Sequence, residues 1–279
     1  MVDSSTDKQL WIIKLGGSII TNDQEFMSPN EDVISNLLLI LLEFSNKYHF
    51  IIVHGAGSFG HPLAKSYQLS KGFLSSKQYD GLILTHDSML ELNNIIVGIG
   101  SRLRLPLVSF PPMTMVTTKK GRIISWDVSP IQIALKLNFI PVIFGDVVFD
   151  EHQQFSILSG DQIVPFLATK LNATKILMLT DVEGVYTKNP KHDPTAKLLK
   201  KLDLSDEDIM KKISAADVNS SGKTRVTGEM GKKLDELLPA LKQGTETYVL
   251  SGLDPKYLRI HFEQPNNYSG TKLVNKQTK

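Results

Sequence analysis

The sequence predicts an α/β fold around a mainly parallel β-sheet. An apolar run over residues 10–15 (LWIIKL) ends at Gly16-Gly17, which is typical of a buried strand that enters a tight turn. A leucine-rich helix is predicted over 33–44, and a short strand over 50–53 ends at a second glycine turn. Strand, helix and strand in this order form the βαβ unit from which parallel sheets are built.

The rest of the chain alternates predicted helices and strands. Apolar residues recur at helical spacing over 75–103, and prolines at 106, 111 and 112 close that region. The polar stretch 201–227 is expected to hold a short helix and a mobile loop. Further strands are expected over 107–110, 121–125, 141–144, 147–149, 175–179 and 248–250, and further helices over 130–137, 161–171 and 229–243.

The composition excludes several classes of protein. Lys and Arg total 31 against 29 Asp and Glu, and this net charge of +2 argues against binding nucleic acid or an anionic membrane through bulk positive charge. The absence of cysteine excludes disulfides, thiolate metal sites and a cysteine nucleophile. No apolar run approaches the roughly 18–20 residues that span a bilayer, and the N-terminus lacks the basic segment of a signal peptide. We therefore expect a cytoplasmic enzyme without nucleic-acid or membrane partners.

The first glycine turn, Gly16-Gly17-Ser18, follows Lys14 in the same predicted strand. A pair of glycines lets backbone N–H groups approach an anion closely, because no Cβ stands in the way. A helix that begins after such a turn adds a favourable dipole. The alternative is a structural turn with a lysine at the sheet edge, and this motif alone does not decide between the two.

The second glycine turn contains Gly55, Gly57 and Gly60, which satisfy the G-x-G-x-x-G pattern of dinucleotide sites. That pattern also requires an acidic residue about 20 positions further on, at the end of a strand. Asp80 has the spacing but lies in a predicted helix, so the context contradicts an NAD site. A phosphate-binding P-loop is excluded as well, because His61-Pro62 replaces the required Lys-Ser/Thr pair.

What remains is a nest of backbone amides beside His61. An imidazolium can hold a phosphate through charge-assisted hydrogen bonds that contribute roughly 1.5–3 kcal/mol each. The alternative is that His61 only satisfies backbone groups at the start of a helix. We interpret His54, at the end of the preceding strand, as a structural residue that fixes the turn.

Seven motifs in register resemble the amino acid kinase superfamily, and within it the isopentenyl phosphate kinases. The histidine after the SFG of the second turn is the feature most specific to that branch. The motifs are KLGGS at 14–18, HGAGSFGHP at 54–62, GD at 145–146, SGDQIVPFLA at 159–168, TDVEGVYTKNP at 180–190, TGEMGKK at 227–233 and GT at 270–271.

The resemblance implies a three-layer αβα sandwich with a mostly parallel central sheet of about eight strands. It implies a single domain over 1–279, with a phosphate-acceptor lobe over 1–172, a nucleotide lobe over 173–279, and a homodimer as the usual assembly. It also implies transfer of the γ-phosphoryl group of ATP, with Mg²⁺, to a small acceptor that already carries a phosphate.

The resemblance also assigns site residues. Lys14 and Lys233 would clamp the transferring phosphoryl group from two sides, while Asp161 holds both ammonium groups. The same resemblance places Gly16, Gly17, Ser18, Thr180, Asp181, Val185 and Tyr186 against the nucleotide, and Gly55, Ala56, Gly57, His61 and Gly160 against the acceptor phosphate. No protein side chain is expected to ligate the metal.

This division of labour suits the chemistry. Phosphoryl transfer depends on positioning and charge neutralisation more than on covalent catalysis. The acceptor oxygen is already ionised near neutral pH, so no general base is needed. Two lysines, Mg²⁺ and a protonated His61 would offset the repulsion between the two anionic reactants. Asp161 also fits an ordinary helix start after Ser159, and both roles are compatible because a helix start can aim its carboxylate.

Two positions depart from the family pattern. Ala56 stands where glycine is usual, so the second turn must keep that residue in an allowed region of φ and ψ. Glu229 replaces a glycine near the expected position of the transferring phosphoryl group, where a carboxylate would weaken ATP binding unless it turns outward or meets Lys232.

The expected reaction is therefore conversion of isopentenyl phosphate to isopentenyl diphosphate, with the helix that carries Tyr79, Ile83, His86 and Leu90 as a wall for the prenyl tail. The same stripe is equally explained by core packing. One alternative is a related kinase of another small phosphate or phosphonate, such as a fosfomycin-type kinase. Another is a nucleotide-binding sensor without catalysis, against which the intact Lys14, Asp161 and Lys233 argue.

Overall fold

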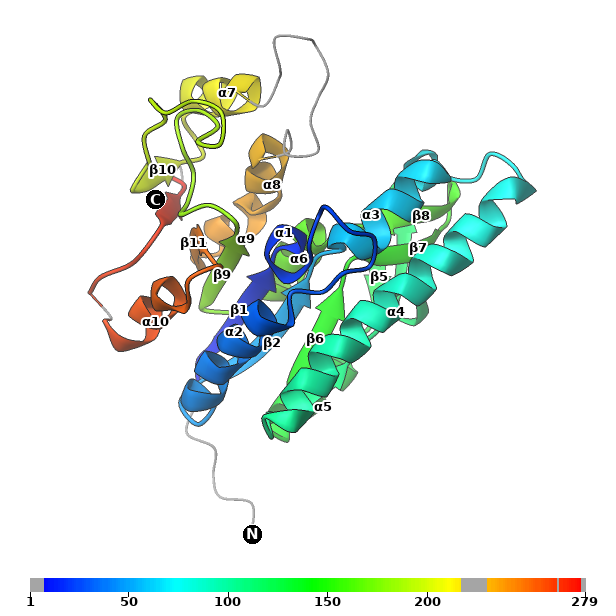
Figure 1. Ribbon diagram of the computed structural model, residues 1–279, viewed down its shortest axis with the longest axis horizontal. Helices are drawn as coiled ribbons and strands as arrows, with labels where there is room; N and C mark the ends of the chain where they lie inside the picture. The colour runs from blue at the N-terminus through cyan, green and yellow to red at the C-terminus, as the bar shows by residue number, and fades with distance from the viewer. Residues whose placement is uncertain (1–7, 217–229, 265, 277–279) are drawn as a thin grey trace.

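Strands from both halves of the chain form one eight-stranded sheet in the computed structural model, which describes residues 8–216, 230–264 and 266–276 (Figure 1). The strand order is β10-β12-β11-β9-β1-β2-β6-β3, and every neighbouring pair is parallel except β11 with β12. The strands are β1 (Leu10–Leu15), β2 (His49–His54), β3 (Leu107–Ser109), β6 (Ile140–Phe144), β9 (Lys175–Thr180), β10 (Lys201–Asp203), β11 (Glu246–Ser251) and β12 (Thr271–Val274).

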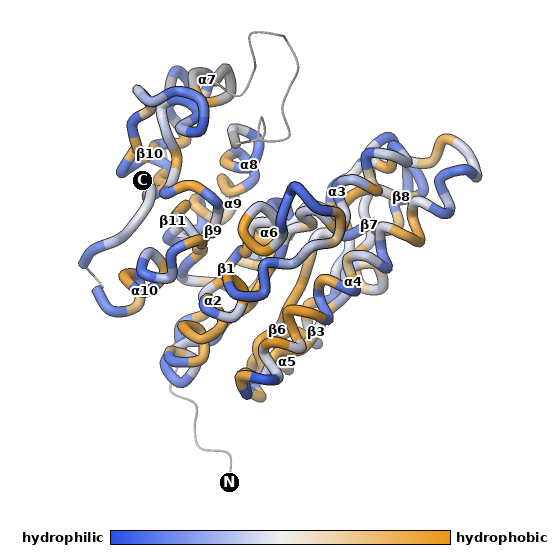
Figure 2. The backbone as a smooth tube through the Cα atoms, viewed as in Figure 1, coloured by the Kyte–Doolittle hydropathy of each residue, from blue (hydrophilic) through white to orange (hydrophobic). Residues whose placement is uncertain are grey.

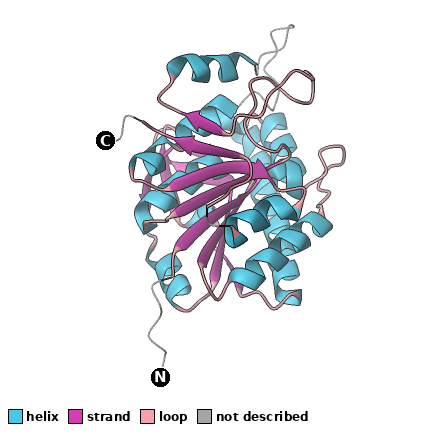
Figure 3. Ribbon diagram, turned by 90° about the vertical axis from the view of Figure 1, so that its left-hand side faces the viewer, coloured by secondary structure: helices cyan, strands magenta, loops and turns pink. Residues whose placement is uncertain are grey.

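Helices cover both faces of this sheet, which makes the three layers expected from the resemblance (Figure 3). One face packs against α2 (Glu31–Phe44), α4 (Tyr79–Arg102) and α10 (Pro255–Glu263). The other packs against α5 (Ser129–Lys136), α6 (Gly160–Leu171), α7 (Glu207–Ala216), α8 (Met230–Glu236) and α9 (Leu238–Lys242). The remaining helices are α1 (Gly17–Ile20), α3 (Gly57–Ser66), η1 (Leu69–Lys71), η2 (Ser76–Gln78) and η3 (Pro112–Thr114). The predicted fold class is confirmed.

The inner strands are apolar on both sides because both sides are covered. In β1, Trp11 and Ile13 enter the core beneath α2 and α10, while Ile12 enters the core beneath α6. Figure 2 shows hydrophobic residues along these strands and in parts of the helices. Lys14 follows the alternation of Ile12, so its side chain leaves the strand on the α6 side.

A second sheet extends the first where the chain leaves β6. Its order is β5-β4-β7-β8, made by β4 (Val116–Lys119), β5 (Arg122–Trp126), β7 (Asp146–Asp150) and β8 (Gln154–Leu158). A single residue, Gly145, separates β6 from β7. The second sheet therefore continues the carboxyl end of β6, the strand next to the edge strand β3, and helps to form that edge of the molecule.

Several predicted elements need correction. The single helix expected over 229–243 is two helices, because Pro239 lacks the N–H that a continuous helix requires and instead lies in the first turn of α9. Strands β4, β8, β10 and β12 and helix α10 were not predicted, while the helix expected within 201–227 is present as α7. The predicted loop after α7 and Glu229 lie outside the described residues. Among the helices that are described, none combines the length and apolar character needed to cross a membrane.

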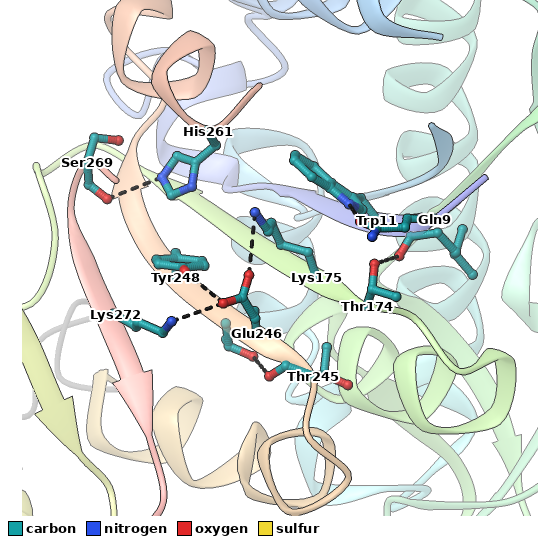
Figure 4. Close-up of polar contacts among 12 residues, drawn as sticks. Gln9, Trp11, Thr174, Lys175, Thr245, Glu246, Tyr248, His261, Ser269 and Lys272 are labelled. Atoms are coloured by element: carbon teal, nitrogen blue, oxygen red, sulfur yellow. Dashed lines mark hydrogen bonds and ion pairs between the residues drawn. The ribbon is translucent and has the colours of Figure 1, made fainter. Parts of the chain in front are cut away.

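A charged and aromatic cluster closes the sheet at the amino ends of β9 and β11 (Figure 4). The Lys175 ammonium lies 4.2 Å from the centre of the Trp11 ring and 3.5 Å from the Glu246 carboxylate. Glu246 also pairs with Lys272 at 3.0 Å, and His261 donates from Nε2 to the Ser269 carbonyl at 3.2 Å. This cluster lies at the opposite edge from the carboxyl ends of the parallel strands, so it stabilises the fold away from the cavity described next.

Candidate functional site

A cavity of about 430 Å³ opens at the carboxyl ends of β1, β2 and β9. Ligand sites of parallel sheets form at this edge, because the loops that follow the strands diverge there. Every site residue expected from the sequence lines the cavity: Lys14, Gly16, Gly17, Ser18, Gly55, Ala56, Gly57, His61, Gly160, Asp161, Thr180, Asp181, Val185, Tyr186 and Lys233. The structure thus brings together motifs that lie more than 200 residues apart in the chain.

The two glycine turns contact each other through their backbones. A Cβ on Gly17 would lie 2.7 Å from the Gly57 Cα, and a Cβ on Gly55 would lie 2.8 Å from the Gly17 nitrogen. Side chains at these positions would force the turns apart. The turn after β1 and the turn after β2 therefore form one continuous backbone surface on the cavity wall.

The second turn keeps Ala56 in the right-handed helical region, with φ −83° and ψ −31°. The sequence required an allowed conformation there, and this requirement is met. Gly57, which has no Cβ, takes the left-handed conformation of the turn with φ +47°. The hydroxyl of Thr21 accepts a hydrogen bond from the Ser58 amide at 3.0 Å. His54 is buried behind the turn and donates from Nδ1 to the Gly55 carbonyl at 3.1 Å, and burial lowers its pKa to about 4.

Asp161 lies at the centre of the positive charge. Its Oδ1 is 2.9 Å from the Lys14 Nζ, and both side chains are largely buried. The start of α6 positions it, because the Ser159 hydroxyl caps the helix by accepting from the Asp161 amide at 3.1 Å. Burial favours the neutral acid, but the charges of Lys14, Lys233 and His61 outweigh burial and hold the pKa of Asp161 below its usual value.

Two lysines and a histidine from three separate elements thus act on one carboxylate, since each lowers the pKa of Asp161. Lys14 comes from β1, His61 from α3, and Lys233 from α8. All three line the same cavity.

The other half of the cavity is formed by residues that follow β9. Thr180 donates from Oγ1 to the Asp181 carboxylate at 3.1 Å, and Asp181 is ion-paired with Lys191. Although burial alone would raise it, the pKa of Asp181 is lowered by that lysine. The Val185 amide donates to the Thr271 hydroxyl at 2.8 Å, which explains how the terminal Gly-Thr motif supports a loop some 85 residues earlier.

Sequence reasoning missed several residues that line the cavity. Lys188 and Lys191 lie within or just after the TDVEGVYTKNP motif, so their proximity to the site could have been inferred. Asp23 and Ser159 also line it. No local pattern in the sequence marks Asp23, whereas Ser159 begins the SGD motif.

Helix α4, which the sequence predicted as a wall for the prenyl tail, does line the cavity, but not through the predicted residues Tyr79, Ile83, His86 and Leu90. Tyr79 and Ile83 are both 54% exposed on α4, and Leu90 packs against the core. The residues of α4 that line the cavity are Thr85 and Met89, and Ala64, Ile157 and Leu158 are apolar residues of the same lining. The error arises because α4 packs on both sheets, so more than one of its faces is apolar.

Comparison with known proteins agrees with this arrangement. The chain matches the amino acid kinase family over residues 9–251. It is 34% identical to an isopentenyl phosphate kinase of Methanothermobacter thermautotrophicus, over 88% of this chain and 91% of that protein. It is 35% identical to that of Methanocaldococcus jannaschii, over 81% and 85% of the two chains.

A solved structure of isopentenyl phosphate kinase covers 95% of this chain and 100% of its own, with 29% identity and a TM-score of 0.80. The motifs, the fold and these likenesses agree. The chain therefore belongs to the amino acid kinase family, and within that family to the isopentenyl phosphate kinases.

Proposed function

We propose that the chain transfers the γ-phosphoryl group of ATP to isopentenyl phosphate, giving isopentenyl diphosphate and ADP. The observation that carries this proposal is the convergence of Lys14, Lys233 and His61 on Asp161 within one cavity. An anionic donor and an anionic acceptor can meet there, because the surrounding cations offset their mutual repulsion.

In the proposed mechanism, a terminal oxygen of the acceptor phosphate attacks the γ-phosphorus, and the bond to the ADP oxygen breaks. Lys14 and Lys233 flank the group in transfer and neutralise the charge that spreads over its oxygens. Asp161 keeps the Lys14 ammonium in place through the 2.9 Å ion pair. No side chain has to remove a proton, because the attacking oxygen is already ionised.

The acceptor would bind on the side of the second glycine turn. The backbone amides of Ala56, Gly57 and Gly160 and the His61 ring would hold its phosphate. Gly55 would line the same turn, because its own amide donates to the Leu15 carbonyl at 2.9 Å. Its hydrocarbon tail would extend toward Met89, Ile157 and Leu158, which give that part of the cavity an apolar wall. Burial of such a tail contributes roughly 25 cal/mol per Å² of apolar surface.

The nucleotide would bind on the other side. Gly16, Gly17 and Ser18 would hold its phosphates, while Thr180, Asp181, Val185 and Tyr186 shape its pocket. We assign residues 1–172 to an acceptor lobe, whose first glycine turn also meets the nucleotide phosphates, and 173–279 to a nucleotide lobe of one domain. We also expect a homodimer, with a mass twice the 31.1 kDa of the chain in light scattering, and a cytoplasmic location.

Magnesium belongs to this proposal as the ion that accompanies ATP. In the described ranges, no group of three or more His, Cys, Asp or Glu residues could hold a metal ion. Asp161 and Asp181 each pair with a lysine instead. This donor set fits an ion that takes its ligands mainly from nucleotide phosphates and water, as Mg²⁺ does. When bound, the ion would neutralise charge on the nucleotide phosphates.

The test is a coupled assay of ADP release with four acceptors: isopentenyl phosphate, dimethylallyl phosphate, geranyl phosphate and fosfomycin. We expect the highest kcat/KM with isopentenyl phosphate. Turnover of fosfomycin without turnover of isopentenyl phosphate would overturn the substrate assignment. Absence of ADP release with every acceptor would favour a nucleotide-binding protein without transfer activity.

A further inference from the structure

A buried ion pair lies beside the cavity and has no part in the mechanism above. Asp146 is the first residue of β7, its side chain is fully buried, and it lines the cavity. His86 of α4 donates from Nδ1 toward both carboxylate oxygens, at 2.9 and 3.0 Å. The Val147 amide donates to the same carboxylate at 2.8 Å. The carboxylate is therefore held from α4 and from its own strand.

The pKa values of both partners are raised. Burial raises the pKa of the Asp146 carboxyl, and the hydrogen bond and charge of His86 act against that rise. The hydrogen bond that His86 donates to Asp146 raises the pKa of His86, although partial burial opposes this, and the charges of Asp146 and Asp87 add to the rise. A protonated imidazole bonded to a carboxylate makes a stronger hydrogen bond than a neutral pair does. Removing either partner would leave the other without its counter-charge in a largely buried place.

The pair is connected to the acceptor side through Gly145. The Gly145 amide donates to the His54 carbonyl at 3.1 Å. A Cβ on Gly145 would lie 3.3 Å from the Gly160 nitrogen and 3.2 Å from the Leu158 oxygen. The residue next to Asp146 is thus packed against the first turn of α6, where Gly160 faces the cavity.

The pair is connected to the apolar wall through α4. Thr85 precedes His86, and Met89 lies one turn further along the helix; both line the cavity. The Met89 sulfur lies 2.8 Å from the position that a Cβ on Gly60 would take, next to His61. A shift of α4 relative to β7 would therefore move the wall against the second glycine turn. Figure 1 shows α4 running alongside β7 at this edge.

We propose that the His86–Asp146 pair is a positioning element of the acceptor site, which locks the α4 wall to the Gly145–Gly160 backbone and so sets the affinity for the phosphorylated acceptor. This role rests on the proposed function, since it concerns the acceptor half of the same cavity. Neither side chain is assigned a contact with the reacting atoms.

The test compares His86→Ala with His86→Asn, because the Asn amide nitrogen can take the place of Nδ1 and donate to Asp146. We expect His86→Ala to raise the KM for isopentenyl phosphate about tenfold, the usual scale for loss of a charge-assisted hydrogen bond. The KM for ATP should change by less than about twofold. His86→Asn should restore most of the acceptor affinity. Glu91→Ala, on the exposed side of the same helix, is the matched control and should leave both constants unchanged.

Thermal melting of each variant separates positioning from stability. If His86→Ala lowers the melting temperature but leaves the acceptor KM unchanged, the pair is only structural and the inference is wrong. An equal rise in the KM values of both substrates, or failure of His86→Asn to rescue, would also overturn it. The turnover of the wild-type chain is measured first. If the wild-type chain does not phosphorylate isopentenyl phosphate, the proposed function is wrong. If it does, and His86→Ala leaves both KM values unchanged, only the proposed role of the pair is wrong.

Discussion

Replacement of Asp161 by Asn tests the electrostatic centre of the site. The amide is nearly isosteric with the carboxylate, and the hydrogen bond from the Asp161 backbone amide to the Ser159 hydroxyl does not depend on the side chain. At the observed 2.9 Å, one pair of unit charges interacts by about 1.4 kcal/mol in water and about 6 kcal/mol at an effective dielectric constant of 20. A loss of about 3–4 kcal/mol of transition-state stabilisation lies within that range and corresponds to a fall of 10²–10³ in kcat.

The direction in which the KM for ATP changes distinguishes loss of the Asp161 charge from general disruption of the site. Removing a negative charge beside the phosphates favours nucleotide binding, so the KM for ATP should stay the same or fall while kcat drops. The measurement is steady-state ADP release at saturating isopentenyl phosphate, with Lys14→Ala as a companion that should also lower kcat. A wild-type kcat in Asp161→Asn, combined with a higher KM for ATP, would refute the proposal that Asp161 holds the lysines for transfer.

Three further changes are predicted. His61→Ala should raise the KM for isopentenyl phosphate while ATP affinity, measured by calorimetry, survives; equal losses of both would contradict the assignment. Gly57→Ala should destabilise the fold by about 1–3 kcal/mol in urea unfolding, because φ is +47° and the new Cβ meets Thr21, whereas Gly121→Ala, with φ +73° and open space around it, should cost less. Burial lowers the pKa of His261 to about 4. Below pH 6.5 this imidazole is therefore protonated in the unfolded chain but stays neutral in the folded chain until the pH approaches 4. The free energy of unfolding should therefore fall between pH 6.5 and 4, by at most about 3 kcal/mol from this group, and a His261→Phe variant with an unchanged slope would contradict this.

The sequence predicts the parallel sheet well because buried strands such as β1 and β2 are continuous apolar runs. It does not reveal β4, whose sequence VTTK is short and polar since that strand belongs to the smaller sheet at the periphery. It also merges α8 with α9, because the helical spacing of apolar residues continues across Pro239. The spacing of apolar residues in a sequence reflects which side chains are buried. It therefore predicts an element poorly where that element buries few side chains.

The site residues are predictable for a different reason. Backbone-based motifs carry their chemistry in consecutive residues, so Gly16, Gly17 and Gly55 can be recognised without knowing the fold. The pairing of His86 with Asp146 cannot be recognised in this way. The two residues lie 60 positions apart, and no single sequence motif contains both. The face that α4 presents to the cavity is equally hidden, since it depends on how the helix packs on two sheets at once.

The direct backbone contact of Gly17 with Gly55 and Gly57 has a consequence for engineering. If the two turns hold the donor and the acceptor as proposed, the gap across which the phosphoryl group travels is fixed by main-chain atoms that point mutations elsewhere leave in place. The tail pocket, built from side chains of α4 and β8, could then be enlarged or narrowed without lengthening that gap. Selectivity for the acceptor and the rate of the chemical step would be separately adjustable properties of this scaffold.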